Sequence, residues 1–285
     1  MKESVITSRA NPLVKSIGGL TDKKNRIKEE AFRFDGIKLF CEAVDFGMDI
    51  KNVILKVPEK ESVKEAVEKA VSSGRLDERC VVRVGESVFE KLSEERAPEG
   101  IITVASFVPS LHCRENFQKA ADIASGHKKI LILESVRDPG NLGAIMRSCN
   151  ALGIELLVIS SDCADIYSPK TIRSAMGAVF KQKTLTVPVE ELAEFITALR
   201  TSGRRVYATA LSDRSLSIDD IKLGESDCFV IGNEGHGLSE GVIESCDAPV
   251  IIPMVEGAES LNAAVAASLC VWETVRIKKY NRGNV

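Results

Sequence analysis

Three short stretches, far apart in the chain, carry polar residues whose types and spacing could do chemistry. They are Asp138, Asn141 and Arg147 in the first stretch, the turn 232–237 (GNEGHG) in the second, and Ser260 and Asn262 in the third. Three glycines in the turn free the backbone to bend sharply and to approach a ligand closely. These groups predict a site that binds and polarises a small molecule, provided that the fold brings the three stretches together.

Each stretch follows an apolar run that is typical of a buried strand. The runs cover residues 130–133, 228–231 and 250–252, and Pro253 should end the last strand because proline cannot donate to a sheet ladder. A loop over 255–259 then leads into an apolar helix. Ligands of open α/β sheets bind beyond the carboxyl ends of the strands, often at a helix N-terminus. We therefore expect the three stretches to meet in one crevice.

Simpler explanations exist for each of these features. Ser260 has the position and chemistry of a helix N-cap, and any one glycine of the turn could serve a tight bend alone. Asn141 and Arg147 are six residues apart, so they share a face only if Asn141 precedes the helix. The pattern G-x-x-G-x-G is neither the dinucleotide fingerprint nor a Walker loop, which argues against an oxidoreductase that binds a dinucleotide.

The elements around the three stretches alternate between strand and helix. Further strands are expected at 156–159 and 205–210, and helices at 141–152, 169–175, 190–199, 240–245 and 261–275. This alternation predicts an α/β fold with a mostly parallel sheet and helices on both faces. Residues 1–107 read as a smaller α/β domain, 108–128 as a linker, and 129–285 as the domain that carries the three stretches.

Composition limits the class of protein. The chain has 285 residues, 44% of them hydrophobic, which is enough for a sizeable core. It has no apolar run near the ~20 residues of a membrane helix and no signal-peptide core at its start, so we expect a cytoplasmic protein. Eight cysteines occur without a C-x-x-C pair, and Cys41, Cys149, Cys228 and Cys270 lie in apolar segments. We expect neither a metal site nor disulfides.

A local basic cluster lies near the N-terminus, although the net charge of the whole chain is −3. Between Lys2 and Lys38 there are nine lysines and arginines against five acids. Lys23, Lys24 and Arg26 follow the helix start at Thr21-Asp22 and could neutralise phosphates of a nucleic acid. The alternative is a solvated helix face.

The motifs resemble those of a known family. Residues 141–147 (NLGAIMR), 231–235 (IGNEG), and 252–254 (IPM) followed by 260–262 (SLN) are similar to the three motifs of the SpoU branch of the SPOUT superfamily, the RNA ribose 2′-O-methyltransferases. Residues 7–15 and 35–38 resemble the small substrate-binding domain that often precedes it, which is itself similar to ribosomal proteins that bind bent RNA. Asp35 replaces a usual glutamate and Glu99 a common glutamine; neither lies in a catalytic motif.

The resemblance implies a fold, a cofactor and a partner. It implies that the C-terminal sheet is threaded into a deep trefoil knot, that S-adenosylmethionine lies bent in that knot, and that the protein is a homodimer through the C-terminal domain. The alanines at 263, 264, 266 and 267 suit close packing of the last helix. The resemblance implies no metal ion in the site.

The resemblance also implies roles for individual residues. We expect the catalytic set to be Arg147, Asn141, Glu234, Ser260 and Asn262. The cofactor-binding set is Ala210, Gly232, Asn233, Gly235, Ile252, Pro253, Met254 and Leu261, and the RNA-binding set is Arg9, Lys15, Lys23, Lys24, Arg26 and Lys38. Because a guanidinium has a pKa above ~12, we favour Arg147 as a stabiliser of the ribose alkoxide, oriented by Glu234, over Arg147 as a base.

Other functions remain open on the sequence. The chain could modify transfer RNA instead of ribosomal RNA, methylate a base, or bind RNA without catalysis on the same scaffold. The N-terminal domain favours ribosomal RNA by analogy. The intact set of five polar residues argues against a catalytically silent protein.

Overall fold

The computed structural model describes residues 5–255, 257 and 260–280, and for residues 277–280 it describes the backbone alone. Lys2 of the basic cluster and Glu256, Ala258 and Glu259 of the loop expected at 255–259 lie outside the described residues. The chain divides into two compact units. The first contains residues 1–108 and 167–180, and the second contains residues 109–166 and 181–285.

The first unit is built on a mixed four-stranded sheet with helices on both faces. Its strands are β1 (Ala31–Asp35), β2 (Ile50–Val57), β3 (Val81–Gly85) and β4 (Ile101–Ser106), in the order β1-β4-β2-β3. Its helices are α1 (Pro12–Gly19), α2 (Lys23–Glu29), α3 (Ile37–Asp45), α4 (Glu61–Ser72), α5 (Glu86–Leu92) and α8 (Pro169–Ala175). Helices α1 and α5 pack on one hydrophobic cluster of the sheet, and α3 and α4 pack on another. The expected small α/β domain is confirmed.

The second unit contains an eight-stranded sheet in which every pairing is parallel. Its strands are β5 (His112–Arg114), β6 (Ile130–Leu133), β7 (Leu156–Ser160), β8 (Thr184–Val187), β9 (Val206–Thr209), β10 (Leu216–Ser217), β11 (Cys228–Ile231) and β12 (Ala248–Ile251). The strand order is β10-β12-β9-β11-β6-β7-β8-β5. The mostly parallel sheet expected from the sequence is therefore present.

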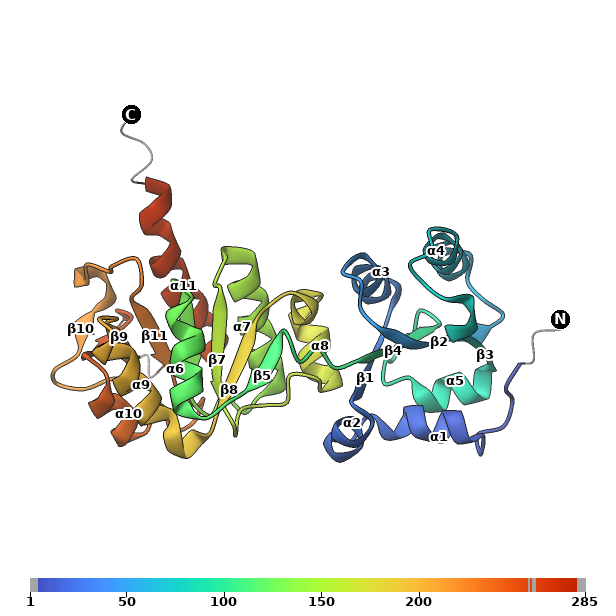
Figure 1. Cartoon of the computed structure of the whole chain (residues 1–285), viewed down its shortest axis with the longest axis horizontal. Coiled ribbons are helices and arrows are strands. Elements are labelled where there is room, and N and C mark those ends of the chain that lie inside the picture. The colour runs from blue at the N-terminus through green and yellow to red at the C-terminus, as the bar shows by residue number, and fades with distance from the viewer. Residues whose placement is uncertain (1–4, 256, 258–259, 281–285) are drawn as a thin grey trace. The chain divides into compact units, whose positions relative to one another are not determined.

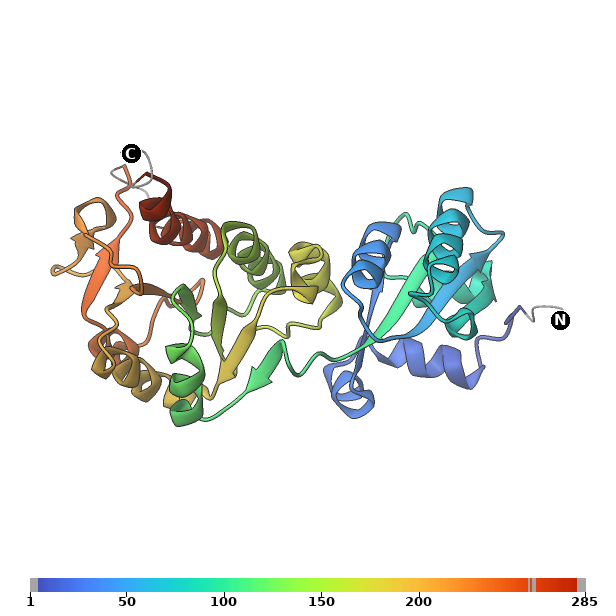
Figure 2. The same cartoon turned by 45° about the horizontal axis from the view of Figure 1, so that its top comes forward.

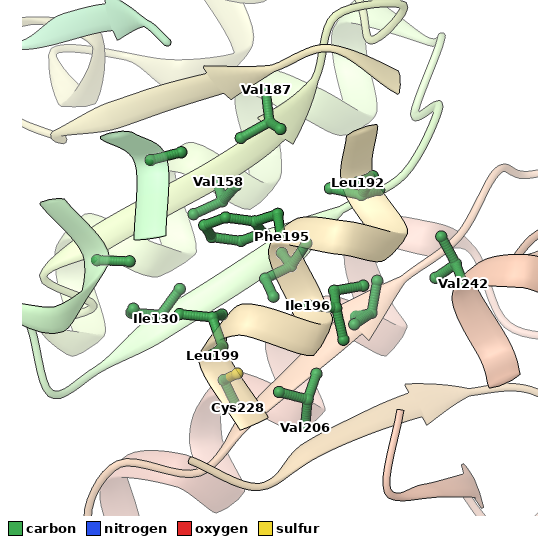
Figure 3. Close-up of a cluster of buried hydrophobic side chains, with 14 of the residues drawn as sticks. Ile130, Val158, Val187, Leu192, Phe195, Ile196, Leu199, Val206, Cys228 and Val242 are labelled. Carbon is green, nitrogen blue, oxygen red and sulfur yellow. The ribbon is translucent and has the colours of Figure 1, made fainter. Parts of the chain in front are cut away.

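Helices cover both faces of this sheet. Figures 1 and 2 show α6 (Phe117–Ser125) and α9 (Leu192–Thr201) on one face, and α7 (Pro139–Leu152) and α11 (Ala263–Tyr280) on the other. In Figure 3, Phe195, Ile196 and Leu199 of α9 point toward strand residues that include Ile130 and Val158. All five side chains are buried. Burial of a large aliphatic or aromatic side chain stabilises the fold by about 1.5–3 kcal/mol, so this layer fixes the strands that carry the site.

Residues 108–128 differ from the linker expected of them. They contain β5, which pairs with β8 at the edge of the sheet, and α6, whose Ala120 and Ala124 are fully buried in the core. The short strand and the small buried side chains gave a weak sequence pattern, which is why the segment resembled a connector. Residues 167–180 also depart from the expected boundary, because they belong to the first unit.

The strand before the last helix is less buried than expected. In β12 only Val250 is fully buried; Ile251, its last residue, and Ile252, which follows it, are half-buried. The strand lies one position from the edge of the sheet, with only the two-residue strand β10 outside it. The strand ends at Ile251, before Pro253, as expected.

Buried cysteines behave as small hydrophobic residues. Cys149, Cys228 and Cys270 are completely buried, whereas Cys41 is half-buried. Burial raises the pKa of the Cys228 and Cys270 thiols to about 12, so both stay protonated near neutral pH. Within the described part of the chain, no helix combines the length and the apolar character needed to cross a membrane.

Candidate functional site

The first stretch forms the N-terminus of α7. Asp138 is the N-cap: its side chain accepts a hydrogen bond from the backbone N–H of Asn141 at 2.9 Å, and Pro139 occupies the first helical position. Asn141 therefore lies inside the first helical turn and not in the loop before it. Six residues at about 100° each separate it from Arg147, so the two side chains point about 120° apart around the helix. They do not share one face.

The second stretch is a turn held by its own asparagine. The side-chain oxygen of Asn233 accepts hydrogen bonds from the backbone N–H groups of Gly235 and His236, and its amide donates to the carbonyl of Ser135 at 2.7 Å. A Cβ atom on Gly232 would lie 2.4 Å from the carbonyl carbon of Gly237, so only glycine fits there. The side chain of Asn233 is thus committed to the turn, and its backbone N–H and C=O groups are hydrogen-bonded to Gly237 in the same turn, at 2.9 and 3.0 Å.

A chain of hydrogen bonds joins all three stretches. The amide of Asn141 donates to Oε1 of Glu234 at 2.9 Å, and the amide of Asn262 donates to Oδ1 of Asn141 at 3.0 Å. The backbone N–H groups of Arg137 and Asp138 also donate to the Glu234 carboxylate, each at 3.3 Å. The sequence predicted that these residues converge, and the described coordinates place them in contact.

The carboxylate at the centre of this chain is held ionised. Burial by itself would raise the pKa of Glu234, but the hydrogen bonds from Asn141 and from backbone N–H groups outweigh it and hold that pKa below its usual value. A carboxylate that accepts several hydrogen bonds is a fixed anchor and not a proton donor at neutral pH. Glu234 therefore suits an organising role.

The third stretch differs from the sequence expectation in one respect. Helix α11 begins at Ala263, and Asn262 caps it: the Asn262 side-chain oxygen accepts hydrogen bonds from the N–H groups of Ala264 at 2.9 Å and Val265 at 3.3 Å. Ser260 is exposed and precedes the cap by two residues. The expected N-cap at Ser260 was wrong, because the helix begins at Ala263 and Asn262 takes the capping position. The Ser260 hydroxyl is consequently free of a capping role.

Arg147 stands apart from this network. It lies on the exposed side of α7 and makes no hydrogen bond or ion pair with any other described residue. The expected orientation of Arg147 by Glu234 is not what the structure shows, because the Glu234 carboxylate instead accepts hydrogen bonds from Asn141 and the α7 N-terminus. The arginine is therefore available to a substrate.

A cavity of about 650 Å³ opens beside the three stretches. Its lining includes the following expected site residues: Ala210, Gly232, Asn233, Glu234, Gly235, Ile252, Met254, Ser260, Leu261 and Asn262. Pro253, Asn141 and Arg147 are not among the lining residues. Lining residues that were not expected are Thr209, Leu211, Ile231, Gly237, Val250, Ile251, Val255, Gly257, Ala263 and Ala266.

The residues that sequence reasoning missed share a position. Thr209 and Leu211 flank Ala210 at the carboxyl end of β9, and Ile231 and Ile251 are the last residues of β11 and β12. Since ligands of parallel sheets bind at these ends, the final residue of each strand was the signal that could have found them. Thr209 itself is tied into the sheet, because its hydroxyl donates to the carbonyl of Val230 at 2.8 Å.

A second network at the same end of the sheet was also missed. Asp162 accepts hydrogen bonds from the hydroxyls of Ser135 and Ser160, each at 2.7 Å, and from the guanidinium of Arg137 at 3.0 Å. Burial would raise the pKa of Asp162, but these partners lower it overall. The network fixes the loop between β6 and α7, whose Ser135 carbonyl in turn holds Asn233.

The expected RNA-binding residues of the first unit fall into two groups. Lys15, Lys23, Lys24 and Lys38 are exposed, and so is Arg9, whose Nε donates to the carbonyl of Ser87 at 3.0 Å. Arg26 is different, because it is 3% exposed and donates to the carbonyls of Leu20 and Thr21 at 2.8 and 2.7 Å. Its place in the phosphate-binding cluster was wrong: this arginine closes the turn between α1 and α2.

Comparison with known proteins agrees with this geometry. The family model of the SpoU rRNA Methylase family matches residues 128–272, and that of the MRM3-like substrate binding domain matches residues 11–103. The 23S rRNA (guanosine(2553)-2'-O)-methyltransferase RlmP of Bacillus subtilis (strain 168) is 30% identical over 267 residues, which cover 94% of this chain and 97% of that protein. The 23S rRNA (guanosine-2'-O-)-methyltransferase RlmB of Vibrio cholerae is 32% identical over 231 residues, which cover 76% of this chain and 91% of that protein.

Solved structures give the same result for the fold. The AdoMet-bound rRNA methyltransferase from Sinorhizobium meliloti superposes with a TM-score of 0.79 at 29% identity, and the match covers 97% of this chain and 99% of that one. A structure described as an RNA 2'-O ribose methyltransferase matches with a TM-score of 0.77 at 27% identity, over 97% of this chain and all of that one. With its three motifs joined by hydrogen bonds beside one cavity, this chain belongs to the SpoU rRNA Methylase family.

Proposed function

We propose that this protein transfers a methyl group from S-adenosylmethionine to a ribose 2′-hydroxyl of ribosomal RNA. The observation that carries the proposal is the hydrogen-bonded chain Asn262–Asn141–Glu234, which ties the three family motifs together at the mouth of the 650 Å³ cavity. Relatives over nearly the whole chain are named as 23S rRNA 2′-O-methyltransferases, which favours ribosomal over transfer RNA.

The cavity suits S-adenosylmethionine in size and chemistry. Its volume lies within the range of about 300–1,000 Å³ that is usual for cofactor sites. Glycines at 232, 235, 237 and 257 and apolar side chains dominate its lining, so most polar groups that it offers are uncharged backbone N–H and C=O groups. The Glu234 carboxylate also lines the cavity, but it accepts hydrogen bonds from Asn141 and from the N-terminus of α7, so backbone groups would supply most of the contacts to a cationic sulfonium. When bound, the cofactor would supply an electrophilic methyl group.

Backbone around three residues would hold this cofactor. Gly232 lines the cavity with its backbone, and the turn requires glycine there because a Cβ atom would collide with the backbone of Gly237. Ile252 follows the end of β12, and Leu261 precedes the cap of α11, so neither has all of its backbone groups bonded within a strand or a helix. The cavity lining supports this proposal, since it includes every residue of the expected cofactor-binding set except Pro253.

Arg147 would act on the ribose. A 2′-hydroxyl gains nucleophilic character as its proton leaves, and the negative charge that develops on the oxygen needs a positioned donor. Arg147 is exposed and without a described partner, so its planar fork can meet the ribose oxygen and a neighbouring phosphate together. Asn141 would position the nucleotide, and the Ser260 hydroxyl and the Asn262 amide would contact the substrate beside the donor.

The first unit would supply RNA affinity. Lys23 and Lys24 lie exposed at the start of α2, and Lys15 and Lys38 are exposed on neighbouring helices. Each lysine that neutralises a phosphate releases counterions, so affinity should fall steeply as salt rises. We infer that this unit holds the RNA while the second unit carries the chemistry.

The last helix supports a homodimer. Helix α11 buries Ala267, Cys270 and Val271 against its own unit, yet Val265, Leu269 and Trp272 on another side are 40–48% exposed. An apolar stripe of this kind is typical of a subunit interface. Sedimentation should show about twice the chain mass, and Leu269→Asp should shift the protein toward monomer, because it places a charge in the stripe.

The trefoil knot and the cytoplasmic location belong to the same proposal. Strand β12 inserts between β9 and β10, which precede it in the chain, and this order supports a threaded C-terminal segment. Because ribosomal RNA is the proposed substrate, we expect the protein to work in the cytoplasm, where it would meet that RNA.

Calorimetry and mapping test the activity. The protein should bind S-adenosylmethionine and S-adenosylhomocysteine but not NAD, and it should transfer labelled methyl to ribosomal RNA. The 2′-O-methyl position that is lost in a deletion strain then identifies the nucleotide. Tight binding of NAD with none of S-adenosylmethionine would end the methyltransferase proposal, and methylation confined to transfer RNA would correct the substrate.

A further inference from the structure

The end of strand β6 carries a buried carboxylate that the proposed chemistry does not use. Glu134 follows β6 directly and is 5% exposed. None of the described lysines and arginines forms an ion pair with it, so no cation offsets its charge. Burial of an ionisable side chain without a counter-charge is costly unless hydrogen bonds satisfy the group. The hydrogen-bond partners of Glu134 therefore indicate its role.

Both oxygens of this carboxylate hold one residue, Ser239. The backbone N–H of Ser239 donates to Oε2 of Glu134 at 2.8 Å, and the Ser239 hydroxyl donates to Oε1 at 2.5 Å. Ser239 is the N-cap residue of α10 (Glu240–Ser245), yet its side chain makes no capping hydrogen bond to that helix. The hydroxyl is committed to Glu134 in place of the capping role that serine usually takes. Two hydrogen bonds thus fix the chain where it leaves the glycine turn 232–237.

The next residue, Ser135, holds the same turn from its other side. The Ser135 carbonyl accepts the hydrogen bond from the Asn233 amide at 2.7 Å. Ser135 has φ +54°, a left-handed conformation that costs energy in a residue other than glycine and persists only where surrounding contacts enforce it. One such contact is the hydrogen bond from its backbone N–H to the Ser160 hydroxyl at 2.8 Å. Two consecutive residues at the end of β6 therefore hold the turn on both sides.

The turn between these two attachments lines the cavity of about 650 Å³. Its lining residues are Gly232, Asn233, Glu234, Gly235 and Gly237, whereas Glu134 and Ser239 do not line the cavity. Residues 234–237 are exposed, so packing against the core does little to fix them. The shape that the turn presents to a ligand is then set by the hydrogen bonds that hold it.

We propose that Glu134 is a positioning residue for the cofactor: by holding Ser239, it keeps the turn 232–237 in the shape that binds S-adenosylmethionine. Glu134 does not line the cavity, so it acts through the turn and not on the ligand. A loop that is already held in its bound shape loses less conformational entropy when the ligand binds. The inference rests on the proposed function and assigns to it a residue outside the three family motifs.

Glu134→Leu separates positioning from stability. Leucine fills a similar volume and removes a buried charge, and the exposed Ser239 can turn its donors to water, so the melting temperature should be kept. Affinity for S-adenosylmethionine in calorimetry should nevertheless fall about 10- to 100-fold, the effect expected when hydrogen bonds to a charged group no longer support the bound shape. In methyl transfer to ribosomal RNA, the KM for S-adenosylmethionine should rise while kcat stays within about 3-fold of wild type.

Two further variants test the hydrogen bonds themselves. Glu134→Gln should bind S-adenosylmethionine within about 3-fold of wild type, because its amide oxygen can accept from the Ser239 N–H while its NH2 group donates to the Ser239 hydroxyl. Ser239→Ala removes one of the two bonds and should weaken binding about 3- to 10-fold. Asp227→Asn is the matched control. Asp227 is also 5% exposed and accepts from the Gly224 N–H at 2.7 Å, but it precedes β11 at the opposite end of the sheet, so this change should leave cofactor affinity unchanged.

The outcomes distinguish the positioning role from the proposed function. Wild-type affinity in a folded Glu134→Leu would overturn the positioning role and leave the methyltransferase proposal intact. If Glu134→Leu does not fold, wild-type affinity in Ser239→Ala would overturn it instead. An equal loss of affinity in Asp227→Asn would also refute the assignment, because any loss of stability would then weaken binding. A wild-type protein that binds no S-adenosylmethionine would end the proposed function itself.

Discussion

Arg147→Lys is the sharpest test of the proposed chemistry, because the structure separates its effect on function from its effect on folding. Arg147 is exposed on α7 and has no hydrogen-bond or ion-pair partner among the described residues. Lysine also has high helix propensity, so the free energy of unfolding should change by less than about 0.5 kcal/mol. Any large loss of activity therefore reports on contact with the substrate.

The expected loss follows from the geometry of the side chain. Lysine keeps the positive charge but loses the planar fork that can contact the ribose oxygen and a phosphate together. Removal of one donor that stabilises a developing oxyanion lowers the rate by about 100- to 1,000-fold, or about 2.7–4 kcal/mol. Single-turnover methyl transfer measures this loss, and calorimetry should show unchanged binding of S-adenosylmethionine. Arg114→Lys, which changes an exposed arginine on β5, is the matched control and should leave the rate unchanged.

The pH profile of the variant distinguishes the two roles of the arginine. If Arg147 acts by charge, deprotonating the introduced lysine near its ordinary pKa of about 10.4 should lower the residual activity further. If it acts as a base, the deprotonated lysine should restore activity. Substantial recovery at alkaline pH, with the protein folded and the cofactor bound, would refute our reading of Arg147.

Four further predictions follow from contacts in the structure. Gly232→Ala should abolish cofactor binding in calorimetry and lower the melting temperature, because its Cβ would lie 2.4 Å from backbone. Glu234→Gln should lower the free energy of unfolding by about 1 kcal/mol at neutral pH, since an amide cannot satisfy all three N–H donors that face the exposed carboxylate. The pKa of Glu234 is lower in the folded than in the unfolded protein, so its contribution to the free energy of unfolding is present above the unfolded pKa and is lost as pH falls through the folded pKa. In chemical denaturation, the free energies of unfolding of wild type and Glu234→Gln should therefore become equal in acid. Lys23→Glu combined with Lys24→Glu should weaken RNA binding and flatten its salt dependence; unchanged RNA affinity in this double variant would mean that the two lysines only form a solvated helix face. Arg26→Met should lower the free energy of unfolding by about 1–3 kcal/mol, because it leaves the carbonyls of Leu20 and Thr21 without their donor.

Much of the fold could be predicted from the sequence. Buried strands such as 228–231 are short, continuous apolar runs between turn residues, and the short helix at 240–245 was located with its observed bounds. Ser168 and Pro169 marked the start of α8, because capping chemistry is local and acts within a single turn. The convergence of three distant stretches also followed from the sequence, since parallel strands bring their carboxyl ends to one edge.

Tertiary contacts decided the partners of several polar side chains, which the sequence pattern could not predict. The sequence could not place the α11 cap, because Ser260 and Asn262 have equal capping chemistry and only the path of the chain selects Asn262. It grouped Arg26 with neighbouring lysines, although carbonyls at the end of α1 draw its side chain inward. It paired Glu234 with Arg147 by charge, whereas Asn141 and two backbone N–H groups lie closer to that carboxylate.

The sequence thus determined which residue types meet at the site, and the packed chain determined which atoms bond to which. Local propensity and strand order act along the chain, so they can be read from it. The partner of a polar group depends on which donors the fold brings within about 3 Å, and that is set by packing between residues far apart in sequence. Arg33 shows this most clearly: in the sequence it is one cation among nine in a basic segment, and only the fold buries its side chain to 3% exposure, with Glu94 as an ion-pair partner at 3.7 Å.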